Sequence, residues 1–477
     1  MAEGSTITGS ASENRGSWAA EIRATIKLAA PIALAFLAEI AIVVADAVMA
    51  GKLGEDAIAA EGLGAHLLFT PQLLAMGVLS SVAALGSHAD GAQDRAMVTR
   101  VSRQGLWLAT LLAIPALAIT ATIPTILTVA GYDPKIVGMS SGMIYVGMAG
   151  IPALLWYTAL RNFATVLHKT RIVVVISLVS LAVAIFSNWL FLYGNWGAPE
   201  LGVTGVGVSW ALASWVQLII MAVYVQRERV LQAYRVLNDL LHPDWRILKD
   251  LFHVGWPIAM SYAFETGLFL ASTLMMGKIS EIAEINEAAL AAHTVVISIS
   301  SVSYMIPYGI SQAATVRVGF YTGAGDPTGA RRAGFIAILL ACIWMVFTGA
   351  LMVLAPHELI GLYIDISNPA NAGALAVALI IIPIGALFQV VDGLQTAAIG
   401  ALRGLKDTHF PMMICFIGYW VIGFGSSFIL TFPLDMGPHG IWLGIFIGLA
   451  ASGTLLTARY QLLSRRLVST GAVAHAA

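Results

Sequence analysis

The stretch Pro31-Ile-Ala-Leu-Ala-Phe-Leu-Ala-Glu39, which continues to Met49-Ala-Gly-Lys52, decides how this 477-residue chain is organised, because it occurs twice. The second copy begins as Pro257-Ile-Ala-Met-Ser-Tyr-Ala-Phe-Glu265 and ends as Met275-Met-Gly-Lys278. Eight of the 22 aligned residues are identical, where this apolar composition gives roughly two by chance. Residues 77–94 match 309–326 at a similar offset. We infer an internal duplication with a period of about half the chain.

The composition places the chain in a membrane. Hydrophobic residues make up 58% and charged residues 11% of the sequence, and the mean hydropathy is +0.84, which a water-soluble globular protein does not show. We predict an all-α integral membrane protein with twelve transmembrane helices in two pseudo-symmetric six-helix lobes. The predicted spans are 27–50, 58–85, 105–127, 138–160, 172–194, 202–225, 251–277, 289–316, 333–355, 373–400, 411–432 and 440–461.

The basic residues indicate which face is cytoplasmic. Of the 25 Lys and Arg residues, 22 fall at one end of the spans, and only Lys52, Lys135 and Lys278 fall at the other. By the positive-inside rule the richer face is cytoplasmic, and so are both termini. The predicted domains are a cytoplasmic tail at 1–26, an N-lobe at 27–225, a cytoplasmic linker at 226–250, a C-lobe at 251–461 and a cytoplasmic tail at 462–477.

Several classes of function are disfavoured by features that the sequence lacks. The first 26 residues have no apolar core before a small-residue cleavage site, so no removable signal peptide is expected. No Gly-x-x-x-x-Gly-Lys-Ser/Thr loop for nucleotide phosphates is present. Cys342 and Cys415 are too few for a disulfide framework or a metal set. We therefore predict no enzyme activity, no cofactor, no metal centre and no nucleic-acid partner, and a transporter driven by an ion gradient or by its substrate.

Five acidic residues lie inside the predicted spans, namely Glu39, Asp46, Glu265, Asp392 and Glu61, the last of them close to the start of the second span. An ionised carboxylate at the bilayer centre costs at least ~2.5–3.5 kcal/mol, so each acid should face water, bind a cation or take up a proton. Lys27 and Arg459 lie at the cytoplasmic ends of their predicted spans, so no Lys or Arg deep in the membrane is available to these acids and a mobile cation is the expected partner. The alternative is a protonated acid that hydrogen-bonds to a neighbouring helix.

Other polar and aromatic residues extend these candidate sites. Asn188 in the fifth span offers an amide oxygen that suits a hard cation beside a carboxylate, and it is equally suited to hold two helices together. Gln389 lies three residues before Asp392 on the same helix face and is placed to hold it. Phe388, Tyr262 and Tyr308 are candidates for a lipophilic substrate pocket, with simple packing or lipid contact as the alternative.

Five segments spread over both lobes carry a family likeness: Ala45-Asp46-Ala-Val-Met-Ala-Gly-Lys-Leu-Gly54, Phe264-Glu265-Thr-Gly-Leu-Phe269, Ala291-Ala-His293, Arg317-Val-Gly319 and Asp392-Gly-Leu-Gln-Thr-Ala-Ala-Ile-Gly-Ala-Leu-Arg-Gly404. They resemble the multidrug and toxic compound extrusion (MATE) transporters of the NorM branch. The resemblance implies a V-shaped twelve-helix antiporter that acts as a monomer in a bacterial inner membrane. It would export small organic cations in exchange for H⁺ or Na⁺ by alternating access, with no cofactor besides the coupling ion.

The resemblance also assigns residues to sites. Glu265 and Asp392 match the cation-site acids of the C-lobe, a candidate Na⁺ site, and Asp46 and Asn188 match the polar site of the N-lobe. Glu39 has no such assignment and stays a candidate for substrate contact. Two positions depart from the family pattern, where NorM relatives often carry Asn or Tyr: Ala184, one turn before Asn188, and Phe388, four residues before Asp392. Both departures remove oxygen ligands that Na⁺ uses, so we expect H⁺ to serve as the coupling ion, with Na⁺ as the alternative.

A lipid-linked-sugar flippase is the alternative function, because such proteins share a duplicated bundle of this kind. Flippase cavities tend to be strongly basic in order to hold pyrophosphate, whereas this chain has no Lys or Arg away from the ends of its predicted spans. A channel would show a repeated pore loop or a ring of acids, and neither is visible. In a transporter, we expect the two lobes to rock about the 226–250 linker and so exchange inward-facing and outward-facing arrangements.

Overall fold

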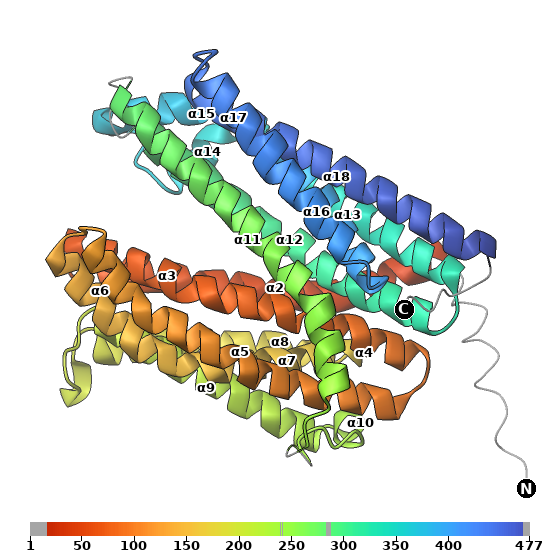
Figure 1. Cartoon of the computed structure of the whole chain (residues 1–477). Coiled ribbons are helices and arrows are strands. Elements are labelled where there is room, and N and C mark those ends of the chain that lie inside the picture. The colour runs from red at the N-terminus through yellow and green to blue at the C-terminus, as the bar shows by residue number, and fades with distance from the viewer. Residues whose placement is uncertain (1–16, 239, 241, 283–287, 471–477) are drawn as a thin grey trace, which may run out of the picture. The chain divides into compact units, whose positions relative to one another are not determined.

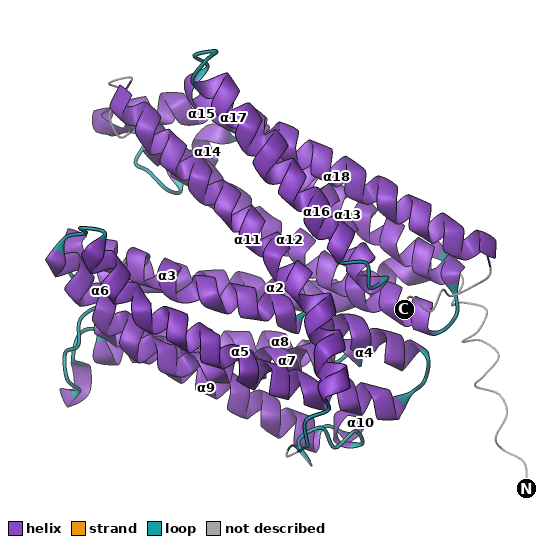
Figure 2. Ribbon diagram, viewed as in Figure 1, coloured by secondary structure: helices purple, strands orange, loops and turns teal. Residues whose placement is uncertain are grey.

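The computed structural model describes residues 17–238, 240, 242–282 and 288–470. Within these residues the chain is helical and has no β-strand, and twelve helical segments are long and apolar enough to cross a membrane (Figure 1 and Figure 2). The prediction of an all-α membrane protein with twelve spans is confirmed.

The first six spans lie between Trp18 and Arg227. They are α2 (Trp18–Gly51), α3 (Glu55–Leu79) continued by α4 (Ser81–Gly91), α5 (Arg95–Val129), α6 (Pro134–Gly147) continued by α7 (Ile151–Val166), α8 (Arg171–Phe191) and α9 (Thr204–Arg227). A 3₁₀ turn at Met148–Gly150 joins α6 to α7. The short helix α10 (Arg229–Gln232) follows the sixth span.

The second six spans begin at Trp245. They are α11 (Trp245–Ile282), α12 (Ala288–Gly323), α13 (Pro327–Leu354), α15 (Ala372–Gly404), α16 (His409–Phe416) continued by a π-helical segment (Ile417–Phe424) and α17 (Gly425–Thr431), and α18 (Gly437–Thr470). The short helix α14 (Pro356–Gly361) lies between the third and fourth of these. Helices α2 and α18 extend beyond the predicted spans into polar sequence, because a helix does not end where its apolar run ends.

The duplication is visible in the turns as well as in the sequence. Asp94 caps α5 and Asp326 caps α13, each by accepting the backbone N–H of the residue three positions on, at 2.9 Å and 2.8 Å. The residue before each aspartate has a left-handed backbone, with φ of 58° at Gln93 and 72° at Gly325. The third span of each half therefore starts from the same turn.

The chain forms two compact units, Leu34–Tyr262 and Met1–Ala33 with Ala263–Ala477. We call them the N-unit and the C-unit. Their boundaries differ from those of the predicted lobes, because α2 and α11 each begin in one unit and end in the other. Both helices contain a proline close to the point where the helix passes from one unit to the other, Pro31 in α2 and Pro257 in α11.

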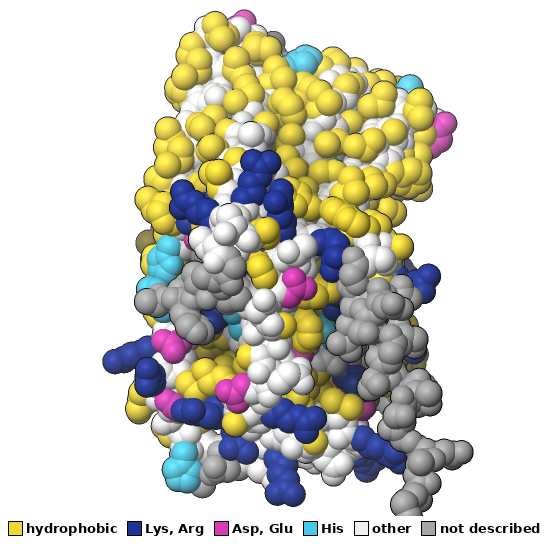
Figure 3. Space-filling model, turned by 90° about the vertical axis from the view of Figure 1, so that its right-hand side faces the viewer, with side chains coloured by type: hydrophobic (Ala, Val, Ile, Leu, Met, Phe, Trp, Pro, Cys, Tyr) yellow, Lys and Arg dark blue, Asp and Glu magenta, His cyan; other side chains and the backbone are white. Residues whose placement is uncertain are grey.

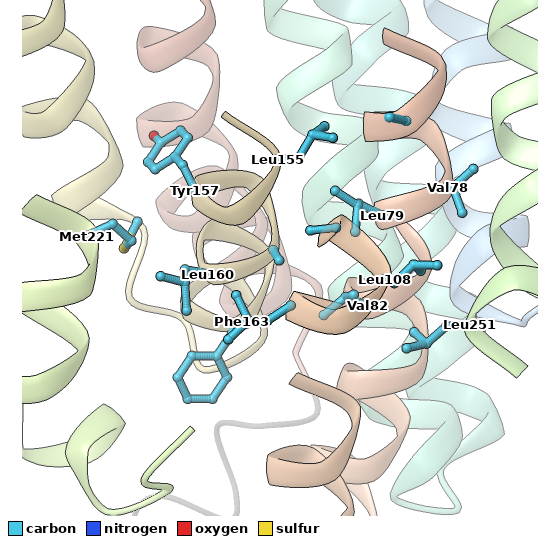
Figure 4. Close-up of a cluster of buried hydrophobic side chains, with 14 of the residues drawn as sticks. Val78, Leu79, Val82, Leu108, Leu155, Tyr157, Leu160, Phe163, Met221 and Leu251 are labelled. Carbon is cyan, nitrogen blue, oxygen red and sulfur yellow. The ribbon is translucent and has the colours of Figure 1, made fainter. Parts of the chain in front are cut away.

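The N-unit has an apolar core to which α3, α5, α7 and α11 contribute (Figure 4). Leu79, Leu108, Leu155 and Leu251 are buried in this core, one from each of these helices. Lipid tails are as apolar as leucine, so close packing rather than exclusion from water holds such helices together. The buried polar residues of the N-unit, such as Asp46 and Asn188, therefore lie among tightly packed helices.

The predicted linker is bound to α5, and it is therefore part of the N-unit. Four side chains of α5 make the contacts: Arg100 pairs with Asp244 at 2.5 Å, and Arg103, Gln104 and Trp107 donate to the backbone oxygens of Arg235 at 3.0 Å, His242 at 3.2 Å and Leu240 at 2.6 Å. The hydrogen bond from Arg100 holds the pKa of Asp244 below its ordinary value.

A buried ion pair fixes the first turn of α2 to α12 within the C-unit. Arg317 donates two hydrogen bonds to the Glu21 carboxylate, at 2.8 Å and 2.5 Å, and the Tyr321 hydroxyl donates a third at 2.6 Å. The Glu21 side chain is 1% exposed and the Arg317 side chain is 14% exposed. A two-pronged pair in such a dry position tolerates the loss of either partner poorly.

We predict that Glu21→Gln destabilises the protein by about 3–5 kcal/mol, because it leaves the Arg317 guanidinium buried without its carboxylate. The matched control is Asp244→Asn, which breaks an ion pair whose arginine is 58% exposed and should cost ~1 kcal/mol or less. Thermal unfolding of the purified protein in mild detergent compares the two variants. Equal losses would contradict the idea that burial sets the strength of the Glu21 pair.

Candidate cation-binding sites

The first candidate site lies in the N-unit between α2 and α8. The side-chain amide of Asn188 donates a hydrogen bond to Oδ1 of Asp46 at 2.5 Å, and both side chains are buried. The Oδ1 atom of Asn188 is buried and has no hydrogen-bond partner among the described residues. Glu61 from α3 is also buried and acts electrostatically on Asp46. The structure thus brings the predicted pair together and adds a second carboxylate.

Ala184 makes one side of this site apolar. It is buried one turn before Asn188 and packs in a small apolar cluster with Ile42 and Ala213. Ala184 thus offers no side-chain oxygen beside Asp46 and Asn188, where the family pattern often has a second amide.

Glu39 has a positively charged neighbour that the sequence did not predict. Nη1 of Arg161 lies 3.4 Å from Oε1 of Glu39, and the arginine side chain is 10% exposed while the glutamate side chain is 34% exposed. The guanidinium also lies 5.3 Å from the ring centre of Phe36 and 5.6 Å from that of Tyr157. The expectation that no arginine pairs with these acids is wrong for Glu39, because α7 continues to Val166 and carries Arg161 inside the helix.

The second candidate site lies in the C-unit, where Glu265 of α11 and Asp392 of α15 interact electrostatically. Asp392 is 4% exposed, and its Oδ1 atom has no hydrogen-bond partner among the described residues. Glu265 is hydrogen-bonded by Tyr304 of α12 and also interacts with Arg403, which is buried near the end of α15. The two acids predicted to share a site therefore interact with each other electrostatically.

The acid–arginine arrangement occurs in both halves of the duplication. Glu39 and Glu265 are equivalent in the aligned stretches, and Ala159-Leu160-Arg161 in the fourth span recurs as Ala401-Leu402-Arg403 in the tenth. Asp46 and Asp392 have no such counterparts, since Ser272 aligns with the first and Gly150 with the second. Each unit thus has a glutamate and an arginine at equivalent positions. Each also has an aspartate, Asp46 or Asp392, whose equivalent position in the other half is not acidic.

Gln389 and Phe388 contact residues of other helices. The Gln389 side chain accepts a hydrogen bond from Thr348 at 2.6 Å and donates one to the sulfur of Met352 at 2.7 Å. The Phe388 ring packs edge-on against Phe269 and Trp442, with ring centres 6.0 Å and 5.8 Å apart. The expectation that Gln389 holds Asp392 is not met, because residues distant in the sequence bind its amide instead.

The two tyrosines proposed for a substrate pocket lie in different units. Tyr308 is half-buried and stacks on Tyr304, with ring centres 5.8 Å apart. Tyr262 is buried at the end of the N-unit, where its ring lies against Gly77 of α3. Tyr304 was not predicted as a site residue, although it lies four residues before Tyr308 and therefore on the same helix face.

Twelve membrane helices in a duplicated plan, with buried acids inside each half, define a membrane transporter. The MatE family model matches residues 31–190 and 257–429, which are corresponding parts of the two halves. The chain belongs to the MatE family of MATE transporters, in its NorM branch.

Relatives and solved structures agree with this assignment. A probable multidrug resistance protein NorM of Mesorhizobium japonicum is 37% identical over 93% of this chain and 94% of the relative. Multidrug resistance protein NorM of Burkholderia vietnamiensis is 36% identical over 93% of this chain and 95% of its own. The crystal structure of the eukaryotic MATE transporter AtDTX14 covers 95% of this chain and 100% of its own with a TM-score of 0.82 at 19% identity, which shows that the fold is shared.

Proposed function

We propose that this protein is a secondary active multidrug efflux antiporter that exports lipophilic organic cations in exchange for H⁺ or Na⁺. The observation that carries the proposal is the Glu265–Asp392 pair, in which two membrane helices bring acids together and one buried carboxylate oxygen has no hydrogen-bond partner among the described residues. A cation or proton that binds there offsets the cost of keeping the charge in a membrane. The names of the NorM relatives, which are multidrug resistance proteins, support drug efflux.

We propose H⁺ as the coupling ion, with Na⁺ as the alternative. A desolvated carboxylate takes up a proton without further ligands, whereas Na⁺ requires several oxygens around it. Ala184 and Phe388 offer none at the two positions where relatives often do, and both are buried in apolar surroundings. In the C-unit, Asp392 is the acid that we assign to the proton, because Glu265 already has Tyr304 and Arg403 beside it.

We assign the organic cation to Glu39. About one third of its carboxylate-bearing side chain is exposed, and the 3.4 Å contact to Arg161 is longer than the usual ~2.7–2.9 Å of a charge-assisted hydrogen bond. The guanidinium also makes cation–π contacts with the rings of Phe36 and Tyr157. A substrate cation can therefore displace the guanidinium from Glu39 while the two rings retain it.

Exchange requires that each site open to the two sides of the membrane in turn, and we propose alternating access for this step. The linker is bound to α5, so bending should fall instead on α2 and α11, the helices that pass between the units. A proline inside a helix removes one backbone hydrogen bond and permits a bend. Pro31 and Pro257 are placed for this role.

The charged residues support an orientation in the membrane. Figure 3 shows Lys and Arg side chains gathered on part of the surface, with hydrophobic side chains covering the surface beside it. Together with the sequence bias of 22 basic residues against three, this pattern leads us to propose a bacterial inner-membrane protein with both termini cytoplasmic. We expect a monomer to suffice, because one chain holds both candidate sites.

The neighbours of Arg161 and Arg403 disfavour a lipid-linked-sugar flippase. Arg161 and Arg403 both lie in membrane helices, but each interacts with a glutamate. A pyrophosphate would have to compete with a carboxylate at each arginine, whereas an organic cation is attracted by the same carboxylates. The site chemistry therefore favours cationic substrates.

We predict that Asp392→Asn and Glu265→Gln each reduce ion-driven efflux at least tenfold, because the ion then has no carboxylate to bind. Asp392→Asn should fold normally, since replacing a buried carboxylate that lacks a hydrogen-bond partner on Oδ1 relieves a desolvation cost. Asp365→Asn, which removes an exposed acid, is the control for a lost charge. Wild-type efflux by well-folded forms of both variants would rule out the C-unit acids as the coupling site.

We predict that Glu39→Gln weakens the binding of a singly charged organic cation about tenfold, which corresponds to ~1.4 kcal/mol, and leaves the binding of a neutral lipophilic compound nearly unchanged. Glu39→Asp keeps the charge and is the matched control. Equilibrium fluorescence titration of the purified protein with both kinds of compound measures the effect. Equal weakening for both compounds would show that Glu39 has only a structural role.

A further inference from the structure

One helix of the C-unit contains an irregular segment that the proposed mechanism has not yet used. Residues Ile417–Phe424 form a π-helix between α16 and α17, a geometry that is rare and occurs frequently at functional sites. Gly418 lets this wide turn approach α18, since a Cβ there would lie 3.1 Å from the backbone oxygen of Gly448. The next residue, Tyr419, also belongs to the π-helix.

Tyr419 points into the C-unit, where its hydroxyl meets α15. It is fully buried and accepts a hydrogen bond from the side-chain amide of Gln395, which is also fully buried. Gln395 lies three residues after Asp392 and therefore on the same face of α15. The Tyr419 hydroxyl is also within electrostatic range of both Asp392 and Glu265.

The hydrogen-bonding capacities of these groups complement one another. A phenol oxygen that accepts a bond from an amide still has its own proton to donate. The nearby Oδ1 of Asp392 is a buried acceptor with no partner among the described residues. Because Gln395 donates to the phenol oxygen, the phenol proton stays available for a second acceptor.

We propose that Tyr419, oriented by Gln395, is a positioning residue of the ion-coupling site and supplies the hydroxyl that Phe388 lacks. Its O–H group stabilises the ionised carboxylate when the site is empty, and its oxygen faces the ion when the site is filled. The π-helix of the eleventh span carries this hydroxyl, which Gln395 binds from α15. This inference rests on the proposed function, because it takes Glu265 and Asp392 to be the coupling acids.

The test is the ion dependence of efflux in proteoliposomes for Tyr419→Phe, which removes only the hydroxyl. Without that donor the protonated site is favoured, so the midpoint of the pH dependence should move up by about one unit, the shift that a lost hydrogen bond of ~1.4 kcal/mol gives. If Na⁺ drives the exchange, the Na⁺ concentration at half-maximal efflux should rise about tenfold instead. An unchanged midpoint in a folded variant overturns the proposal.

Tyr460→Phe is the matched control, because Tyr460 is equally buried in the C-unit and donates its hydroxyl to the backbone oxygen of Ala330 at 2.7 Å. It should lower thermal stability without moving the midpoint, and an equal shift in this variant counts against a specific role of Tyr419. If Tyr419→Phe does not fold, Gln395→Leu takes its place, with a smaller shift of the same sign expected and no shift overturning the proposal. Asp392→Asn distinguishes a failure of the coupling site from a failure of the role of Tyr419. Wild-type efflux by Asp392→Asn refutes the coupling site itself. If Asp392→Asn loses efflux and the midpoint of Tyr419→Phe does not move, only the role of Tyr419 is refuted.

Discussion

The cost of holding carboxylates inside membrane helices is the constraint on which this structure depends. Each buried acid must have a hydrogen-bond donor, a fixed positive charge or a bound cation. The protein uses the first two solutions at three acids: Arg317 lies beside Glu21, Arg161 beside Glu39, and Asn188 beside Asp46. Asp392 has one oxygen that neither solution reaches among the described residues, and we therefore propose it as the place where a mobile ion binds.

The duplication explains why one fold can hold two different sites. The halves share their span order, their caps at Asp94 and Asp326, and an acid–arginine arrangement on the first and fourth spans. They differ in the second acid, which is Asp46 on the first span of one half and Asp392 on the fourth span of the other. We propose that this common frame holds a site for an organic cation in the N-unit and a site for a coupling ion in the C-unit.

Much of this could be predicted from the sequence, and the exceptions have physical reasons. The spans and the pairing of Asp46 with Asn188 and of Glu265 with Asp392 follow from apolar runs, repeat symmetry and family likeness. Arg161 was misplaced because its helix continues past the apolar run that marked the span. The partners of Gln389, and the approach of Tyr419 to α15, depend on contacts between distant segments and on a π-helix, which helix periodicity does not reveal.

The account is tested most directly by measuring efflux of a fluorescent organic cation from proteoliposomes under an imposed pH gradient or an imposed Na⁺ gradient. It predicts that an inward H⁺ gradient drives uphill export by the wild-type protein, and that Asp392→Asn abolishes this export while still binding the cation. Export driven only by Na⁺ would reverse the choice of coupling ion. Cation movement that neither gradient drives uphill would contradict the antiport mechanism itself.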